Sequence, residues 1–372
     1  MLHGMLKSSL LYYEKFVTDT KQTGYAVNPC DICVANKMVH GKQHTLTWHV
    51  DDVKASHADK KVNDEFAKWC DSKHGSVGKV KVKRGMTHDY LGMTLDYSDS
   101  GKLKVDMRKH TEKDLLEEFP FPVPMCKAPW NESMFKINSK SELLTPKEAE
   151  IFHTFTVKGM FLVKRARPDE EPGFGFLSSR VRNPTQQDKD KLIKILGHLK
   201  HTINDALTLE ANGKGILCWY ADASFAIHHD MKSHTGSIFA LGKGAISSSS
   251  TKQKINARST TESELIGVDD KIAKIIWSKK FIDHQGFKIT SCMIFQDNAS
   301  TTKLLENGRH STGKRTRHFD IRLFHAKDLI ERKEVVVKYC PTDEMLADYM
   351  SKPLVGKAFR TNRESILNIA HH

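Results

Sequence analysis

The sequence predicts an α/β protein, and three observations carry that prediction. Clusters of helix- and strand-breaking residues divide the 372 residues into three regions. The third region, from about Gly213, shows strand patterns first, then a helix, a strand and further helices. Its long helix carries an aliphatic stripe at helical spacing, formed by Leu265, Val268, Ile272 and Ile275. Together these patterns predict an α+β segment followed by a mixed-sheet α/β domain.

The first region runs to about Phe119 and mixes one helical pattern with short strand patterns. Its apolar residues follow a helical period over 2–16. Alternating or β-branched runs then predict strands over 45–50, 79–83 and 90–97.

The second region begins at Phe119–Pro124, where three prolines alternate with other residues. Proline lacks an amide donor and biases the residue before it away from helix, so this stretch predicts a linker or domain edge. Helical patterns return over 145–164 and 186–199, and Pro168–Gly173 breaks the region between them.

In the third region, acidic residues stand where elements end or begin. The apolar run 216–221 predicts a central strand ending in Asp222, with hairpin partners over 236–241 and 245–248. A strand over 293–296 ends in Asp297, a helix follows over 298–306, and the last strand covers 335–339. Asp348 is expected on a helix after this strand.

The bulk composition favours a polyanionic partner. The formal net charge is +13, and nucleic acid is the polyanion most consistent with it, although a merely soluble basic protein would show the same excess. Seven cysteines without a dense framework suggest a reducing compartment, and the lone C-x-x-C of Cys30 and Cys33 predicts packing thiols rather than zinc. No leader segment or apolar run of membrane-spanning length is visible, so we expect a soluble, intracellular protein with no membrane partner.

Four carboxylates are candidates for one metal site: Asp222, Glu264, Asp297 and Asp348. Glu264 is preferred to Glu262 because it lies closer to the centre of the aliphatic stripe. A lone aspartate is usually a solvated surface charge, but four acids at the ends of successive elements can converge. Converging carboxylates repel one another unless cations lie between them, and hard oxygen ligands favour Mg²⁺ or Mn²⁺. The expected site therefore holds two such ions and cuts a phosphodiester.

The third region also resembles the ribonuclease H domain of copia-type retrotransposon Pol polyproteins. The similar motifs are Tyr220–Ser224, Ser259–Leu265, Asp297–Ser300, Thr316–Arg322 and Leu346–Pro353. The resemblance implies a ribonuclease H-like fold that cleaves the RNA strand of RNA/DNA hybrids, with the four carboxylates as catalytic metal ligands. We expect Asp222 and Asp297 to be shared ligands, Glu264 to orient one ion and Asp348 to complete the other.

The resemblance continues upstream into a reverse transcriptase. Trp48–Asp52 is similar to the aromatic-Val-Asp-Asp turn of a palm, which makes Asp51 and Asp52 further candidate metal ligands. Flanking segments also resemble that family: Leu2–Lys7 together with Tyr12–Lys15, Tyr90–Met93, and Arg165–Asp169. The implied domains are a partial palm (1–119), a thumb or connection segment (120–212), a ribonuclease H-like domain (213–356) and a tail (357–372).

Two departures from the family bear on polymerase activity. His49 stands where tyrosine or phenylalanine is commoner, which removes no metal ligand. The first catalytic aspartate of such palms comes from a strand before the Leu2–Lys7 segment, and this sequence starts after that point. We therefore expect the isolated chain not to polymerise DNA.

Basic residues suggest where an RNA/DNA hybrid would bind. Lys79, Lys81 and Lys83 alternate, so on a strand they would project from one face, with Arg84 adjoining. A second group, including Arg315 and Arg317, follows the Asp297 helix. A solvated charged surface is the alternative for both groups.

The expected protein is a retrotransposon-derived reverse transcriptase/ribonuclease H fragment. It would act inside the cell, in cytoplasmic virus-like particles or in the nucleus, as a homo-oligomer or with other parts of a retroelement polyprotein. The alternative is a catalytically inactive relic that only binds nucleic acid.

Overall fold

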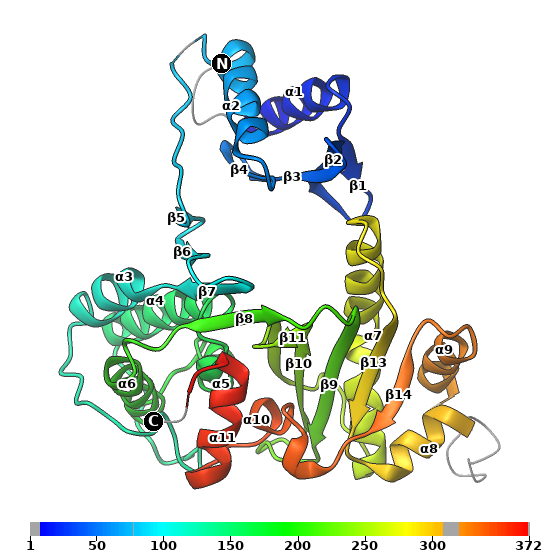
Figure 1. The fold of residues 1–372 in the computed structure, drawn as a ribbon. Helices are drawn as coiled ribbons and strands as arrows, with labels where there is room; N and C mark the ends of the chain where they lie inside the picture. The colour runs from blue at the N-terminus through cyan, green and yellow to red at the C-terminus, as the bar shows by residue number, and fades with distance from the viewer. Residues whose placement is uncertain (1–7, 77, 308–319, 371–372) are drawn as a thin grey trace. The chain divides into compact units, whose positions relative to one another are not determined.

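The computed structural model describes residues 8–76, 78–307 and 320–370, which form two compact units (Figure 1). Unit 1 comprises Met1–Gly92 and Trp277–Lys288, and unit 2 comprises Met93–Ile276 and Ile289–His372. Both units combine helices with sheets, which confirms the predicted α/β class. The four sequence-predicted domains and their boundaries stay predictions. None of the helices in the described part of the chain is long and apolar enough to cross a membrane.

Unit 1 is an antiparallel four-stranded sheet, in the order β1-β2-β3-β4, accompanied by two helices. In chain order its elements are α1 (Ser8–Gln22), β1 (Ala26–Asn28), β2 (Asp31–Val39), β3 (Lys42–His49), β4 (Asp52–Ser56), α2 (Lys60–His74) and β5 (Thr87–Tyr90).

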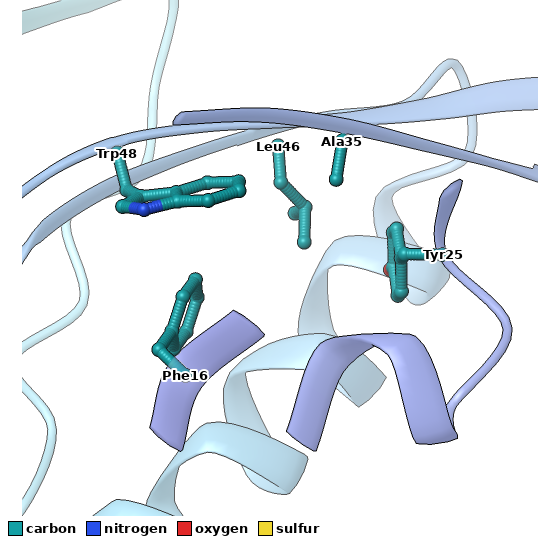
Figure 2. Close-up of a cluster of buried hydrophobic side chains, with 5 residues drawn as sticks. All are labelled: Phe16, Tyr25, Ala35, Leu46 and Trp48. Carbon is teal, nitrogen blue, oxygen red and sulfur yellow. The ribbon is translucent and has the colours of Figure 1, made fainter. Parts of the chain in front are cut away.

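The core of unit 1 is largely aromatic (Figure 2). Phe16 of α1 lies with its ring centroid 5.3 Å from that of Trp48 on β3, in an edge-to-face arrangement. Tyr25, Ala35 and Leu46 complete the buried cluster. Because β3 buries alternate residues, Trp48 points into this core, and the chain reverses just beyond it at residues 50–51.

Unit 2 contains two sheets and most of the helices. Its first part holds β6 (Met93–Asp96), β7 (Lys102–Asp106), α3 (Arg108–His110), η1 (Thr111–Glu117), α4 (Pro146–Val163), η2 (Pro168–Glu170), α5 (Glu171–Ser178) and α6 (Gln186–His201). Its second part holds β8 (Leu207–Ala211), β9 (Ile216–Ser224), β10 (His234–Ala240), β11 (Gly242–Lys243), β12 (Ser247–Lys252), α7 (Thr260–His284), β13 (Ser291–Gln296), α8 (Ala299–Asn307), α9 (Asp320–Glu331), β14 (Val336–Tyr339), η5 (Thr342–Glu344), α10 (Asp348–Ser351) and α11 (Gly356–Leu367). The last residues of α7 are grouped with unit 1.

The main sheet of unit 2 has the order β12-β10-β9-β13-β14. β12, β10 and β9 are antiparallel, whereas β13 and β14 run parallel to β9. The other sheet places β8 between β11 and β7, with β6 beside β7. The mixed main sheet puts the carboxyl ends of β9 and β13 side by side, because these neighbouring strands are parallel.

Different helices cover the two faces of the main sheet. A Cβ added to Gly236 on β10 would lie 2.5 Å from the carbonyl oxygen of Ala347, so α10 packs directly on this face. The next position, Thr235, faces Gly267 of α7 on the other side. Alternate residues of a strand point to opposite faces, so α7 and α10 sandwich the sheet.

Local sequence explains the start of the second-region helix. Thr145 caps α4: its hydroxyl accepts from the amide of Glu148, and the Glu148 carboxylate accepts from Thr145 in return. This reciprocal capping satisfies amides that the first helical turn leaves unpaired. The predicted break at Pro168–Gly173 contains the 3₁₀ turn η2 and the first turn of α5.

A buried ionic network joins the C-terminal helix to the second region. Arg167 pairs with Asp169, with Nη2 2.8 Å from Oδ2. Arg363 of α11 donates to the same Asp169 oxygen at 2.9 Å and to Asp205 at 2.6 Å. The Tyr349 hydroxyl donates to the backbone oxygen of Asp169 at 2.9 Å. The residue after Asp348 is therefore anchored to this network.

Candidate active site

Asp222 lies at the centre of the candidate site. It stands on β9, the middle strand of the main sheet, directly opposite Gly236 on β10. The structure continues β9 to Ser224, so Asp222 lies inside the strand and not at its end as expected. Its side chain is buried and accepts a hydrogen bond from the Ser351 hydroxyl.

Glu264 comes from the second turn of α7 and is buried. The Nε2 of Gln296 donates to its Oε2 at 3.1 Å. Glu262, the competing candidate, is engaged at the start of the helix. Its amide donates to the Ser259 hydroxyl, and its carboxylate accepts from the Arg258 amide at 2.5 Å. Glu262 therefore caps the helix, which leaves Glu264 as the acid that enters the site.

Asp297 follows β13 immediately and is half-buried. The Thr342 hydroxyl donates to its Oδ2 at 3.2 Å. Because β13 is parallel to β9, Asp297 is brought to Asp222. Ligand atoms of Asp222, Glu264 and Asp297 all lie within 4.8 Å of one another.

Asp348, the fourth candidate, opens the short helix α10 and lies beside this group of three. It is buried, and the Nζ of Lys352 is 2.6 Å from its Oδ1. The same ammonium is 3.5 Å from Oδ2 of Asp222. Lys352 thus links Asp348 to the central aspartate.

The pKa values of Glu264, Asp297 and Asp348 are all raised. Burial raises the pKa of Glu264 well above its ordinary value, and the charges of Asp222 and Asp297 raise it further. Burial and Asp222 also raise the pKa of Asp297, and together they bring that of Asp348 to about 7. Like charges held this close favour protonation or the binding of a cation.

This donor set fits a small hard divalent ion. Three carboxylates offer oxygen atoms at a spacing that one ion can bridge, and a cation would relieve the repulsion between them. Oxygen-only ligation suits Mg²⁺ or Mn²⁺ better than zinc.

The palm-like aspartates occupy a hairpin in unit 1. Asp51 lies in the two-residue turn between β3 and β4, and Asp52 is paired with His49 as the first residue of β4. Both side chains are exposed. Within residues 8–76 and the other described segments, neither belongs to a group of three potential metal ligands.

The first basic segment is exposed, but it is not a strand. Lys79, Lys81 and Lys83 lie in irregular backbone, so the predicted alternation on one face of a strand is wrong. Among the described residues no strand pairs with this segment, and its Val80 and Val82 are also exposed, so no apolar face is buried to fix a strand. Arg84 pairs with Asp64. Arg315 and Arg317 lie outside the described residues.

Sequence reasoning missed the polar partners of the carboxylates: Gln296, Thr342, Ser351 and Lys352. Only the contact of Lys352 with Asp348 could have been predicted from sequence, because a lysine four residues after an aspartate on a helix faces it. The other three meet their carboxylates through the tertiary fold.

Two curated relatives match most of the chain. A retrovirus-related Pol polyprotein from the Nicotiana tabacum transposon TNT 1-94 is 27% identical over 383 aligned residues, which cover 98% of this chain and 27% of that protein. A Pol polyprotein from the Arabidopsis thaliana transposon RE1 is 27% identical over 73% of this chain and 18% of its own length. The chain spans about a quarter of these relatives or less, and its similarity to copia-type Pol polyproteins is confirmed. No protein-family model matches.

Two solved structures share 13% identity with the chain. An N-terminal RNase H domain from Mycobacterium tuberculosis, fused to maltose-binding protein, aligns with 40% of this chain and 97% of its own, with a TM-score of 0.26. A prototype foamy virus protease–reverse transcriptase mutant aligns with 96% of this chain and 41% of its own, with a TM-score of 0.27.

Proposed function

We propose that this chain, similar along its length to copia-type Pol polyproteins, is a retrotransposon-derived reverse transcriptase/ribonuclease H fragment. Its ribonuclease H-like part hydrolyses the RNA strand of RNA/DNA hybrids with two divalent metal ions. The observation that carries this proposal is the meeting of Asp222, Glu264 and Asp297 within 4.8 Å, with Asp348 alongside.

Each carboxylate has a role that its position supports. Asp222 belongs to the group of three and also lies 3.5 Å from the ammonium that pairs with Asp348, so we assign it as a shared ligand, and sharing by Asp297 stays a prediction. Glu264 and Asp297 complete the first metal position, and Asp348 completes the second with Asp222. The chemistry that a divalent pair supplies when bound is activation of the attacking water and stabilisation of the leaving oxygen.

The surrounding polar groups hold these acids in place. Gln296 orients Glu264, Thr342 orients Asp297, and Ser351 orients Asp222. Fixed ligands keep the site assembled before substrate arrives, which is the condition for efficient metal-assisted hydrolysis.

The rest of the chain has proposed roles in binding. A net charge of +13 suits an RNA/DNA hybrid, with the exposed Lys79, Lys81, Lys83 and Arg84 as candidate phosphate contacts in unit 1. The hairpin with Asp51 and Asp52 is proposed as the remnant of a polymerase metal site. A location in cytoplasmic virus-like particles or in the nucleus belongs to the same proposal, as does assembly with itself or with other polyprotein parts.

The test is Mg²⁺-dependent cleavage of an RNA/DNA hybrid labelled on its RNA strand. We expect wild-type protein to cut the hybrid but not single-stranded RNA, and Asp222→Asn to lose activity by about 10²-fold or more. Asp343→Asn removes an exposed acid from the neighbouring turn η5 and should cut like wild type.

Equal products from wild type and Asp222→Asn would contradict the proposal. If wild-type protein binds the hybrid but does not cleave it, the result would instead support the alternative, a catalytically inactive relic that only binds nucleic acid.

A further inference from the structure

Lys352 places a positive charge inside the carboxylate site. Its ammonium nitrogen is 2.6 Å from Oδ1 of Asp348 and 3.5 Å from Oδ2 of Asp222. The ammonium therefore lies between the two carboxylates that we assign to the second metal position. The group of three ligands at the first position does not include Asp348.

The local backbone directs Lys352 to this position. Its amide donates to the carbonyl oxygen of Asp348 at 2.9 Å and closes the single turn of α10. The neighbouring Ser351 hydroxyl donates to Asp222, which fixes the end of this helix against β9. A lysine four residues after Asp348 on this turn reaches the gap between Asp348 and Asp222.

The lysine is held there by charge and not by burial. Its side chain is 34% exposed, whereas those of Asp222 and Asp348 are 1% and 9% exposed. A long, flexible stem with one face open to solvent can swing away without unfolding its surroundings.

We infer that Lys352 is a displaceable counter-cation: it neutralises the Asp222–Asp348 position, and a divalent cation enters that position only when the ammonium leaves it. This inference rests on the proposed function, because it assumes that the four acids bind divalent ions. The two positions are then unequal. The first ion binds Asp222, Glu264 and Asp297 without displacing a charge, and the second binds more weakly.

The test is calorimetric titration of the full chain with MnCl₂, together with thermal unfolding in EDTA and in Mn²⁺. We expect wild-type protein to show one tighter and one weaker site. Lys352→Gln removes the competing charge, so the weaker site should tighten on the order of tenfold. The same variant should melt at a lower temperature in EDTA and gain more from Mn²⁺ than wild type does.

Two further variants separate competition from a purely structural effect. Lys352→Arg retains the positive charge, so the Mn²⁺ affinity of its weaker site should equal that of wild type. If Lys352→Gln does not fold, Lys352→Arg can still be titrated. Lys338→Gln removes one positive charge from an exposed position on β14 and should titrate like wild type.

The outcomes are distinguishable. A wild-type protein that binds no Mn²⁺ would defeat the proposed function itself. Two wild-type sites with no tightening in Lys352→Gln, or with loss of the weaker site, would overturn this inference while leaving the metal site standing. If the weaker site tightened equally in Lys338→Gln, the effect would come from the net charge of the protein and not from competition by Lys352. That result would also overturn the inference.

Discussion

At the scale of one residue, the raised pKa of Asp348 makes the free energy of unfolding depend on pH. Burial and the charge of Asp222 raise its pKa to about 7, although the pairing with Lys352 acts in the opposite direction. Below pH 7 the folded protein therefore holds a proton that the unfolded chain releases near its ordinary pKa. This difference makes stability depend on pH.

The first residue-scale prediction follows from the sign of that shift. A raised carboxyl pKa contributes stability at low pH that is lost as the pH rises from about 4 to 7. In EDTA, Asp348→Asn should lose less stability over this interval than wild type, by on the order of 1–3 kcal/mol. The measurement is urea unfolding at several pH values.

Buried histidines provide the internal reference for that experiment. Burial lowers the pKa of His228 to about 4 and that of His234 well below its ordinary value, so their contribution is lost as the pH falls below 6.5. Both proteins contain them, so the difference between the two curves isolates Asp348. Parallel curves would show that Asp348 does not carry the raised pKa.

Some site residues can be chosen from sequence and others cannot. The choice of Glu264 over Glu262 rests on helical spacing, and the structure brings Glu264 to Asp222 and Asp297. The hydroxyl partners Ser351 and Thr342 cannot be found that way, because their contacts depend on how distant segments pack.

At the scale of elements, Gly236 decides how closely α10 approaches the sheet. It lies opposite Asp222, and an added Cβ would come within 2.5 Å of the Ala347 oxygen and 2.6 Å of the Ser351 nitrogen. Both are backbone atoms, so the clash cannot be relieved by rotating a side chain. The absent side chain therefore helps to place Asp348 beside Asp222.

The element-scale prediction is that Gly236→Ala moves α10 away from β10. We expect a stability loss of about 1–3 kcal/mol and a fall in hybrid cleavage of about 10- to 100-fold, because ligands of the second position would be displaced. Thermal unfolding and the cleavage assay measure the two effects.

Gly267→Ala is the matched control on the other face of the same sheet. There an added Cβ meets Ala223 and Thr235 at 3.5 Å, which is ordinary contact, and alanine favours the helix by up to about 1 kcal/mol. If both alanine variants behaved alike, close packing of α10 would not be what positions Asp348.

Element prediction from sequence succeeds where one face of an element is buried. The aliphatic stripe lies on α7 and its residues are buried, and β9 and β13 contain the predicted runs 216–221 and 293–296. The segment 79–83 alternates equally well, but no strand in the described part of the chain pairs with it. Alternation marks a strand only when another strand supplies the hydrogen bonds.

At the scale of the whole molecule, the C-terminal helix is part of unit 2 rather than an appendage. Phe359, Ile366 and Leu367 of α11 are buried, and Arg363 reaches Asp169 and Asp205. Sequence spacing cannot pair Arg363 with acids 158 or 194 positions away, so the role of this helix is visible only in the fold.

The whole-molecule prediction concerns this connection. Arg363→Met removes one partner of a buried ion pair and should destabilise the protein by about 3 kcal/mol, because Asp169 and Asp205 lose their shared cation. Arg360→Met changes an exposed arginine on the same helix and should cost little. Equal unfolding midpoints for the two variants would show that the network does not hold α11 in place.

The central claim is that acids from β9, α7, the end of β13 and α10 meet to bind divalent ions. Anomalous diffraction from crystals soaked in MnCl₂ tests this claim most directly. We predict one manganese peak among Asp222, Glu264 and Asp297, and a second peak between Asp222 and Asp348 with Lys352 turned away. Well-ordered carboxylates at saturating MnCl₂ with no anomalous peak between them would contradict the claim.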